Sequence, residues 1–285
     1  MILNNLGNIS FNQGCFDSAI EHYNQSLELK NKITDEKGKW ASYHNLGKSY
    51  LMIGDLESGI EFLLKALHVQ KVRKNQIEKS NTLVELISAY LSLNDDNMAK
   101  YYHLELFGIR NITMNKIVDL YYRYSKGLIY SFYDTENFVK LANQEFLDII
   151  NDTVINHEIT TVSLIRLCHH KIHEIDQEDV KSEIRDIQYY IDELLYLSKL
   201  NRSYSLNAEG LLLQSMINKY LDFDELSHLQ LVQAELLIVE QNLLYLIPTL
   251  EDYKLERAKL AASQTKDELL LVSCIKRINN MKNHI

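Results

Sequence analysis

Proline, glycine and cysteine are scarce in this chain. Its 285 residues include one proline, nine glycines and three cysteines. This composition leaves few residues for tight turns between strands, and no window sustains the alternation of apolar and polar residues that half-buried strands require. The cysteines, Cys15, Cys168 and Cys274, lie far apart in apolar helical settings, which favours reduced core thiols over a disulfide framework. We therefore expect an all-α protein.

The sequence also lacks long apolar runs and an excess of basic residues. No stretch of eighteen or more apolar residues occurs, and the N-terminus shows no basic region followed by an apolar stretch and a cleavage site. We therefore expect no membrane segment and a cytoplasmic location. The formal net charge of −9 argues against a nucleic-acid partner, because nucleic-acid binding depends on Lys and Arg that match phosphates.

One pattern recurs four times with a period of about 40 residues. The copies are centred on Leu6-Gly7, Leu46-Gly47, Leu86-Ile87 and Gly127-Leu128. A fixed period of this length indicates a solenoid, in which each repeat buries its apolar face by stacking on the next. The fold that we predict is a right-handed α-solenoid of stacked antiparallel helix pairs.

The second copy shows how one repeat is built. From Trp40 to Ile53, apolar residues recur at steps of three and four, as on one face of a helix. Gly54 then suits the left-handed conformation that ends a helix, and Asp55 can cap the helix that follows. Similar helix-ending and capping residues recur at Gly14, at Asn94-Asp95 and at Asp134-Thr135, so four helical hairpins are expected.

Small residues recur at matching places in the repeats. Gly7, Gly47 and Gly127 share one position, and Ala19, Gly59 and Ala99 share another. Glycine inside a helix costs about 0.8–1.0 kcal/mol relative to alanine, so its recurrence points to close helix packing. With Tyr23, Tyr50 and Leu63, this pattern resembles the tetratricopeptide repeat (TPR) in a version of about 40 residues. The resemblance implies a non-catalytic protein-interaction scaffold without a cofactor.

The period changes after Thr153, which divides the chain into two predicted regions. Residues 1–152 hold the four repeat-like helix pairs. Residues 153–285 continue the solenoid with divergent helix pairs, expected at 155–172, 180–200, 203–220 and 224–241, followed by C-terminal capping helices. Pro248 suits the first turn of one such helix, and Thr265 to Glu268 match a capping box that opens the last one. This half is similar to the downstream half of long microbial TPR arrays.

The candidate binding site is the inner surface that the first helix of each pair lines in TPR arrays. Aligning Gly7 with Gly47 places Asn5 and Asn45 at one position of this face, and Asn8 and Lys48 at another. The resemblance implies that these asparagines bind the backbone of an extended peptide, since an amide offers both a donor and an acceptor. The same face continues at two tyrosines of the fourth repeat, Tyr121 and Tyr124. The opposing interpretation is that these asparagines only solvate a helix.

Two more specific activities are weakly supported. TPR domains that clamp a C-terminal carboxylate need Lys or Arg where this chain has Asn4, Asn81 and Glu85, so that mode is not expected. His169 and His173 lie four residues apart, a spacing at which two imidazoles can bind one metal ion with Glu174 or Glu158. The full H-E-x-x-H pattern is absent, and surface histidines are the simpler explanation.

Three functional hypotheses remain open from the sequence. The first is a scaffold that binds a peptide or protein segment in its groove, with self-association left open. The second is a sensor or regulatory module of a signalling or transcription-control system, suggested by Met1, which begins almost inside the first helix. The third is a metal-dependent enzyme built on His169 and His173. The first is the function that we predict.

Overall fold

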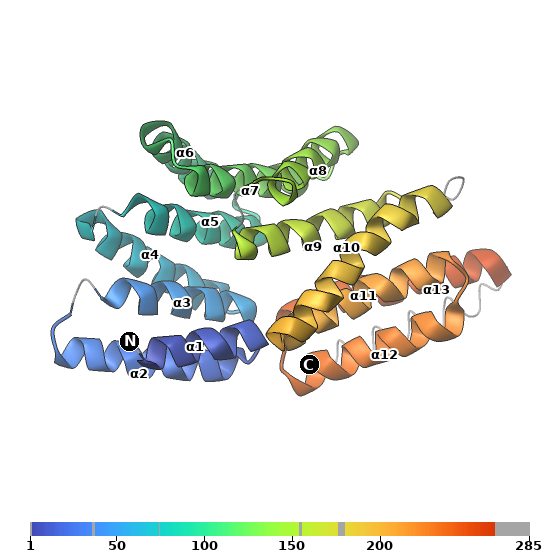
Figure 1. Cartoon of the computed structure of the whole chain (residues 1–285), viewed down its shortest axis with the longest axis horizontal. Coiled ribbons are helices and arrows are strands. Elements are labelled where there is room, and N and C mark those ends of the chain that lie inside the picture. Colours follow the sequence, from blue (N-terminus) through green and yellow to red (C-terminus); the bar gives the residue numbers. More distant parts are fainter. Residues whose placement is uncertain (1, 36–37, 74, 154–155, 176–179, 266–285) are drawn as a thin grey trace. The chain divides into compact units, whose positions relative to one another are not determined.

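The computed structural model describes residues 2–35, 38–73, 75–153, 156–175 and 180–265. Within these ranges the chain forms thirteen α-helices and one short 3-10 helix, and no strand (Figure 1). The all-α prediction is therefore confirmed. The first eight helices are α1 (Ile2–Gln13), α2 (Phe16–Lys32), α3 (Lys39–Met52), α4 (Leu56–Arg73), α5 (Gln76–Ser92), α6 (Asp96–Thr113), α7 (Lys116–Phe132) and α8 (Glu136–Ile150). They are followed by α9 (His157–His173), α10 (Val180–Asn201), α11 (Tyr204–Tyr220), α12 (Asp224–Glu240), the 3-10 helix η1 (Leu244–Leu246) and α13 (Ile247–Thr265).

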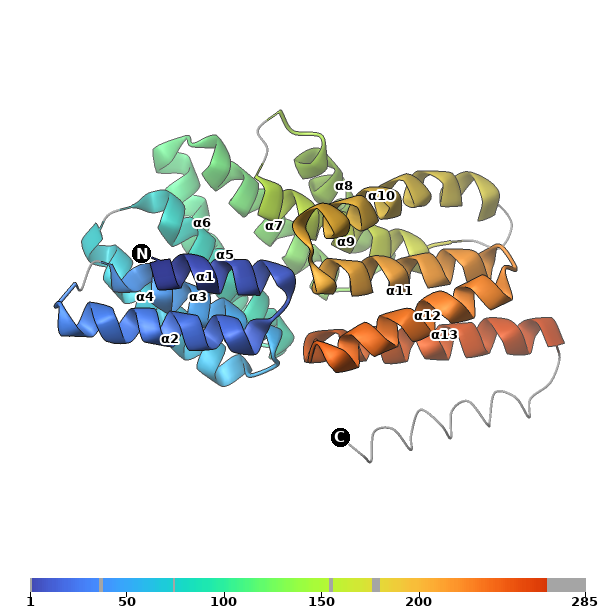
Figure 2. The ribbon, with the colours of Figure 1, turned by 60° about the horizontal axis from the view of Figure 1, so that its bottom comes forward.

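The chain forms two compact units, residues 1–170 and residues 171–285. In the first unit each helix from α1 to α8 packs on the next one, and α1, α3, α5 and α7 also contact one another in succession. In the second unit α11 packs against α10, α12 and α13, and η1 contacts α12 and α13. Figure 2 gives a second view of both sets of antiparallel neighbours. This succession of packed helices is that of the predicted helical repeat solenoid.

The helix ends occur at the predicted residues. The backbone φ is positive at Gly14, Gly54, Asn94 and Asp134, which lie 40 residues apart. Asp55 then accepts a hydrogen bond from the backbone N–H of Ser58 at 3.0 Å, as an N-cap side chain does. The turn inside each of the four hairpins therefore follows the sequence signal.

Two of the turns that join one hairpin to the next also contain a residue with positive φ. These residues are Thr34, midway in sequence between Gly14 and Gly54, and Met114, midway between Asn94 and Asp134. The hydroxyl of Thr113 donates to the Ile109 carbonyl at 2.9 Å, so it does not cap the next helix. Asn115 caps α7, accepting from the Ile117 N–H at 2.9 Å. An Asn after a left-handed residue satisfies the backbone N–H groups that Thr113, still helical, cannot reach.

A regular spacing of turns returns in the second unit. Arg202, Asp222 and Asn242 have positive φ and are 20 residues apart, and α11 and α12 each span 17 residues. The helices expected from the sequence at 203–220 and 224–241 match α11 and α12 to within one residue, although none of these three left-handed residues is glycine. Pro248 lies in the first turn of α13, as predicted. The predicted capping box starts at the last residue of α13, and the rest of it lies outside the described residues.

The glycines of the repeats lie at close helix contacts. A Cβ atom on Gly47 would lie 2.6 Å from Cγ of Leu63 and 3.0 Å from the carbonyl oxygen of Gly59, and a Cβ on Gly59 would lie 3.2 Å from the carbonyl oxygen of Gly47. Helices α3 and α4 therefore approach until backbone meets backbone. Gly7 faces the ring of Tyr23 and Gly127 faces the ring of Phe146 in the same way.

Replacing Gly47 with leucine tests this contact. The new side chain would collide with Leu63 and with the backbone of α4, and overpacking of this kind costs about 1–3 kcal/mol of folding free energy. Glu57→Leu, on the exposed side of α4, is the control and should change stability by no more than about 0.5 kcal/mol. Chemical denaturation of both variants gives the comparison. Equal midpoints would show that α3 can move away from α4 at little cost.

Candidate functional site

All six predicted site residues lie on the first helices of their pairs. Asn5 and Asn8 are on α1, Asn45 and Lys48 on α3, and Tyr121 and Tyr124 on α7. The contacts of α1 with α3, of α3 with α5 and of α5 with α7 join these helices into one layer. The residues nevertheless differ in burial and in the contacts that they make.

Asn8 and Asn45 are hydrogen-bonded to each other across α1 and α3. The Nδ2 group of Asn45 donates to Oδ1 of Asn8 at 2.8 Å, and the hydroxyl of Tyr23 donates to the same oxygen at 2.9 Å. Tyr23 comes from α2 and is buried. Two donors on Oδ1 fix the orientation of the Asn8 amide, so its Nδ2 group points away from them. Asn5 lies exposed one turn earlier on α1.

This arrangement leaves the NH2 group of one amide and the oxygen of the other free. Within the described residues, Nδ2 of Asn8 and Oδ1 of Asn45 have no hydrogen-bond partner. A peptide unit carries one C=O acceptor and one N–H donor, so the pair presents the complementary groups for one peptide unit. The orientation of both amides is set by bonds inside the protein, which lowers the entropy cost of binding.

Lys48, one turn beyond Asn45, is the centre of a charged cluster. Its ammonium forms a hydrogen-bonded ion pair with Glu158 at the start of α9, lies 3.7 Å from the carboxylate of Glu85 on α5, and sits 5.0 Å from the ring centroid of Phe11. The side chains of Lys48, Glu85 and Glu158 are 14, 22 and 47% exposed. Residues of α1, α5 and α9 therefore surround the amine that α3 contributes.

The charges of this cluster shift one another's pKa values. Burial alone would lower the pKa of the Lys48 ammonium, but the carboxylates of Glu158 and Glu85 overcome that effect and raise it. The Lys48 charge holds the pKa of Glu158 below its usual range. Burial raises the pKa of Glu85, against the opposing effect of Lys48. When all three groups are ionised, one cation and two carboxylates give the cluster a formal charge of −1.

Tyr121 and Tyr124 are buried rather than open to the surface. Their side chains are 5 and 7% exposed. The hydroxyl of Tyr121 accepts a hydrogen bond from Asn156 at 3.4 Å, and burial raises the pKa of this phenol to about 12. The ring of Tyr124 lies 6.0 Å from that of Phe146. In this structure both rings are part of the packing between helices.

The structure adds three residues that sequence reasoning did not place in the site: Tyr23, Glu85 and Glu158. Glu85 had a usable signal, because it follows Asn5 and Asn45 by the 40-residue period. Tyr23 was predicted only as a packing residue. Glu158 had no such signal, since it lies beyond the point where the period breaks.

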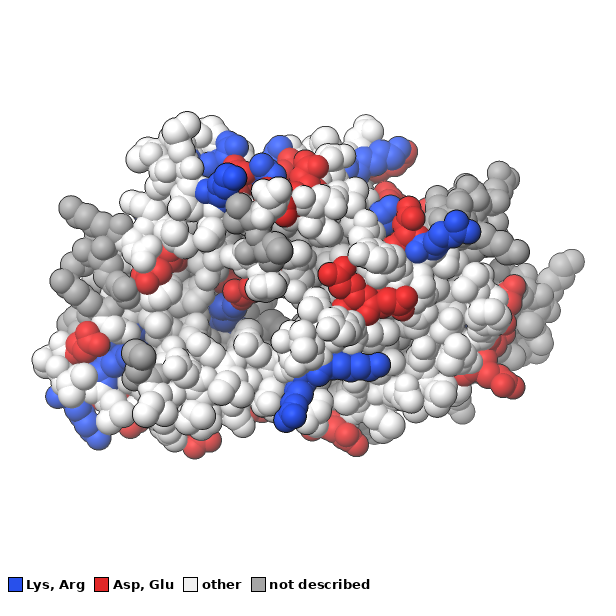
Figure 3. Space-filling view, viewed as in Figure 1, with Lys and Arg blue, Asp and Glu red and all other residues white. Residues whose placement is uncertain are grey.

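Charges of both signs are mixed on the face of the molecule that Figure 3 shows. Figure 3 shows acidic and basic side chains interspersed on one face, without a continuous field of Lys and Arg among the described side chains. No three His, Cys, Asp or Glu residues of the described ranges lie close enough together to hold a metal ion. None of the helices described is long and apolar enough to cross a bilayer.

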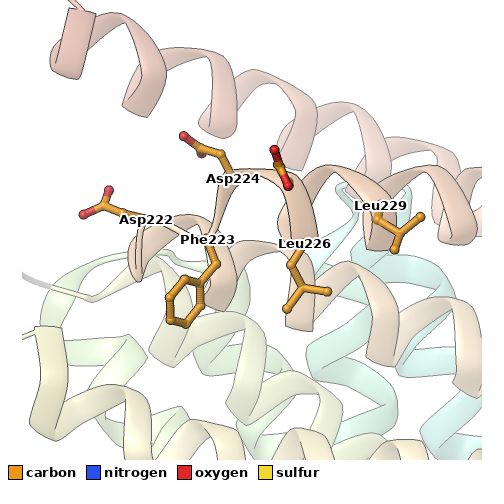
Figure 4. A pocket seen from close by; sticks show the side chains of 6 residues that line it. Asp222, Phe223, Asp224, Leu226 and Leu229 are labelled. Carbon is orange, nitrogen blue, oxygen red and sulfur yellow. The ribbon is translucent and has the colours of Figure 1, made fainter.

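A separate pocket lies at the start of α12 in the second unit. It is lined by Asp222, Phe223, Asp224, Glu225, Leu226 and Leu229. In Figure 4 the side chains of Phe223, Leu226 and Leu229 extend to one side of the helix, and those of Asp222 and Asp224 lie away from them. The pocket therefore has an apolar wall beside acidic residues, and it contains none of the six predicted site residues.

Comparison with known proteins identifies the N-terminal repeats. The model of the tetratricopeptide repeat family matches residues 1–71, which span α1 to α4. This match confirms the resemblance inferred from Leu6-Gly7 and Leu46-Gly47. No curated protein matches the sequence of the chain.

Removing the Lys48 ammonium tests the charged cluster. Lys48→Met leaves the partly buried Glu85 without its cation. We expect it to lower the free energy of unfolding by about 1–3 kcal/mol at neutral pH, less than for a fully buried pair because Glu158 is half exposed. Lys65→Met, which breaks the exposed pair of Lys65 with Glu61, should cost under about 0.5 kcal/mol.

The stability difference between wild type and Lys48→Met should depend on pH. Because the pKa of Glu158 is lowered in the folded state, its stabilising effect is present above its ordinary pKa and is lost as the pH falls through the lowered value. Lys48 also lowers the pKa of Glu85 against the effect of burial, so without Lys48 protonation of Glu85 stabilises the variant more than it stabilises the wild type. The stability difference between wild type and Lys48→Met should therefore shrink in acid. Urea denaturation at several pH values measures it, and a cost equal to that of Lys65→Met would contradict the assignment.

Proposed function

Because residues 1–71 carry tetratricopeptide repeats, a protein-interaction module, we propose that this chain is a non-catalytic scaffold that binds an extended protein segment along α1 and α3. The observation that carries the proposal is the pair of free amide groups, Nδ2 of Asn8 and Oδ1 of Asn45. A backbone C=O of the partner accepts from the first, and a backbone N–H donates to the second. Asn5, exposed one turn before Asn8, extends the polar strip along α1.

The charged cluster supports binding to an internal segment of the partner rather than to its C-terminal carboxylate. Lys48 lies one turn beyond Asn45, and the carboxylates of Glu85 and Glu158 already compensate its charge. A partner carboxylate placed here would meet a net negative charge. A neutral or basic segment meets no such repulsion.

The role of Tyr121 and Tyr124 in this proposal is indirect. Both rings are buried, so they support α7 and, through the contact of Tyr121 with Asn156, the residue that accepts the Ile159 N–H in the first turn of α9. Glu158 projects from that turn to Lys48. The tyrosines thus help to position the charged end of the site.

A change from Asn8 to Asp tests the proposal with little damage to the fold. Aspartate keeps an oxygen that accepts from Tyr23 and Asn45, but it replaces the free N–H donor by a second acceptor. Alanine is less suitable, because it would leave the buried Tyr23 hydroxyl without its acceptor, at a cost of about 1–3 kcal/mol. Asn31→Asp makes the same change of charge on the exposed side of α2 and is the matched control.

Binding is measured in two steps. A library of immobilised unstructured peptides is screened with the wild-type chain, and the peptides retained are then titrated calorimetrically against wild type, Asn8→Asp and Asn31→Asp. Loss of one hydrogen bond in a partly dry groove costs about 1–3 kcal/mol, so Asn8→Asp should weaken binding by at least about tenfold. Equal affinity of all three proteins would place the partner elsewhere on the chain.

A further inference from the structure

One helix of the first unit has an outer face unlike those of its counterparts. The second helices of the pairs, α2, α4 and α8, carry exposed charged residues along that face, such as Glu21, Glu61 and Asp148. On α6, which lies at the edge of the unit in Figure 1, the exposed residues from 101 to 112 include no charged one. They are Tyr101, Leu104, Phe107, Asn111 and Ile112.

These apolar side chains are well exposed. Tyr101, Leu104 and Phe107 are 60, 67 and 40% exposed, and Ile112 and Met114 are 84 and 90% exposed. Monomers rarely carry apolar patches larger than about 300–600 Å², and patches of that size are often binding sites. The charged residues of this part of α6 are paired within the chain: Lys100 with Asp96 at 2.7 Å, Glu105 with Lys79 at 2.6 Å, and Arg110 with Asp119.

Gly108 lies in the middle of this row, and no contact among the described residues requires a glycine there. Its backbone is not left-handed, and a Cβ atom added there would meet no other atom within 4 Å. The other helical glycines, such as Gly47, each face a neighbouring helix at close range. A glycine inside a helix lowers its stability relative to alanine, so Gly108 fits best where another helix approaches from outside.

We propose that a second copy of this chain docks on this face, with the two α6 helices crossing antiparallel at Gly108. Leu104, Gly108 and Ile112 form one row with a spacing of four residues, the ridge that helices interdigitate most often. The row has its large side chains at equal distances on either side of Gly108. A two-fold axis at Gly108 therefore places Leu104 of each copy opposite Ile112 of the other, as a self-complementary contact requires. This inference is independent of the peptide site.

The expected dimer is weak. A stable interface buries about 800 Å² on each partner, and a single helix crossing supplies less than that. Dimerisation should accordingly appear only as the protein is concentrated, with a dissociation constant in the micromolar range. Sedimentation velocity of the full chain over a concentration series measures it.

Leu104→Glu places a charge one turn from the centre of the crossing, twice per dimer, and should weaken dimerisation by at least tenfold. Leu64→Glu is the matched control, because Leu64 precedes Leu104 by the 40-residue period and is exposed at the corresponding place on α4. It should dimerise like wild type. Circular dichroism confirms that each variant is folded, and Ile112→Lys serves as a second disruptive variant at a side chain that is 84% exposed.

Combining Leu104→Glu with Ile112→Lys in one chain tests the antiparallel geometry. The introduced carboxylate then faces the introduced ammonium of the other copy, and dimerisation should recover from the level of either single variant. A wild-type chain that stays monomeric up to its solubility limit would overturn the proposal. So would a dimer that resists Leu104→Glu, or a double variant without recovery.

Discussion

The structure of the first unit depends on how closely the two helices of a pair can approach. At Gly47 and Gly59 the backbones of α3 and α4 are separated only by van der Waals contact, and side chains such as Leu63 fill the space beside them. This distance sets the position of every side chain farther along the pair. Because each repeat packs on its neighbours, an error in one pair would be passed to the next.

The positions of Asn8 and Asn45 in the candidate site depend on this close packing of helices. Tyr23, whose ring lies against Gly7, extends its hydroxyl to Asn8 and so fixes the amide that orients Asn45. One side chain thus joins the core of the first repeat to the surface between the first and second repeats. Polar groups held in this way are stiff, and stiffness favours the recognition of an extended chain, because less freedom is lost when the partner binds.

The charged cluster at Lys48 joins helices that no local signal connects. Its carboxylates come from α5 and α9, and the pairing of Lys48 with Glu158 closes a loop of more than one hundred residues. The amine and carboxylates are partly withdrawn from water, so each charge depends on the others to remain ionised. The cluster also sets the sign of the charge beside the free amide groups of Asn8 and Asn45.

The sequence alone determined the helices, the turns and the close contacts of the first unit. Gly14, Gly54, Asn94 and Asp134 marked the hairpins because few residues adopt a left-handed conformation at low cost, and Gly47 marked a close approach because glycine weakens a helix unless packing requires it. The tertiary structure decided the rest. Whether Tyr121 is buried, which amide groups of Asn8 remain free, and that Glu158 reaches Lys48 all depend on contacts between distant segments, for which a local pattern carries no information.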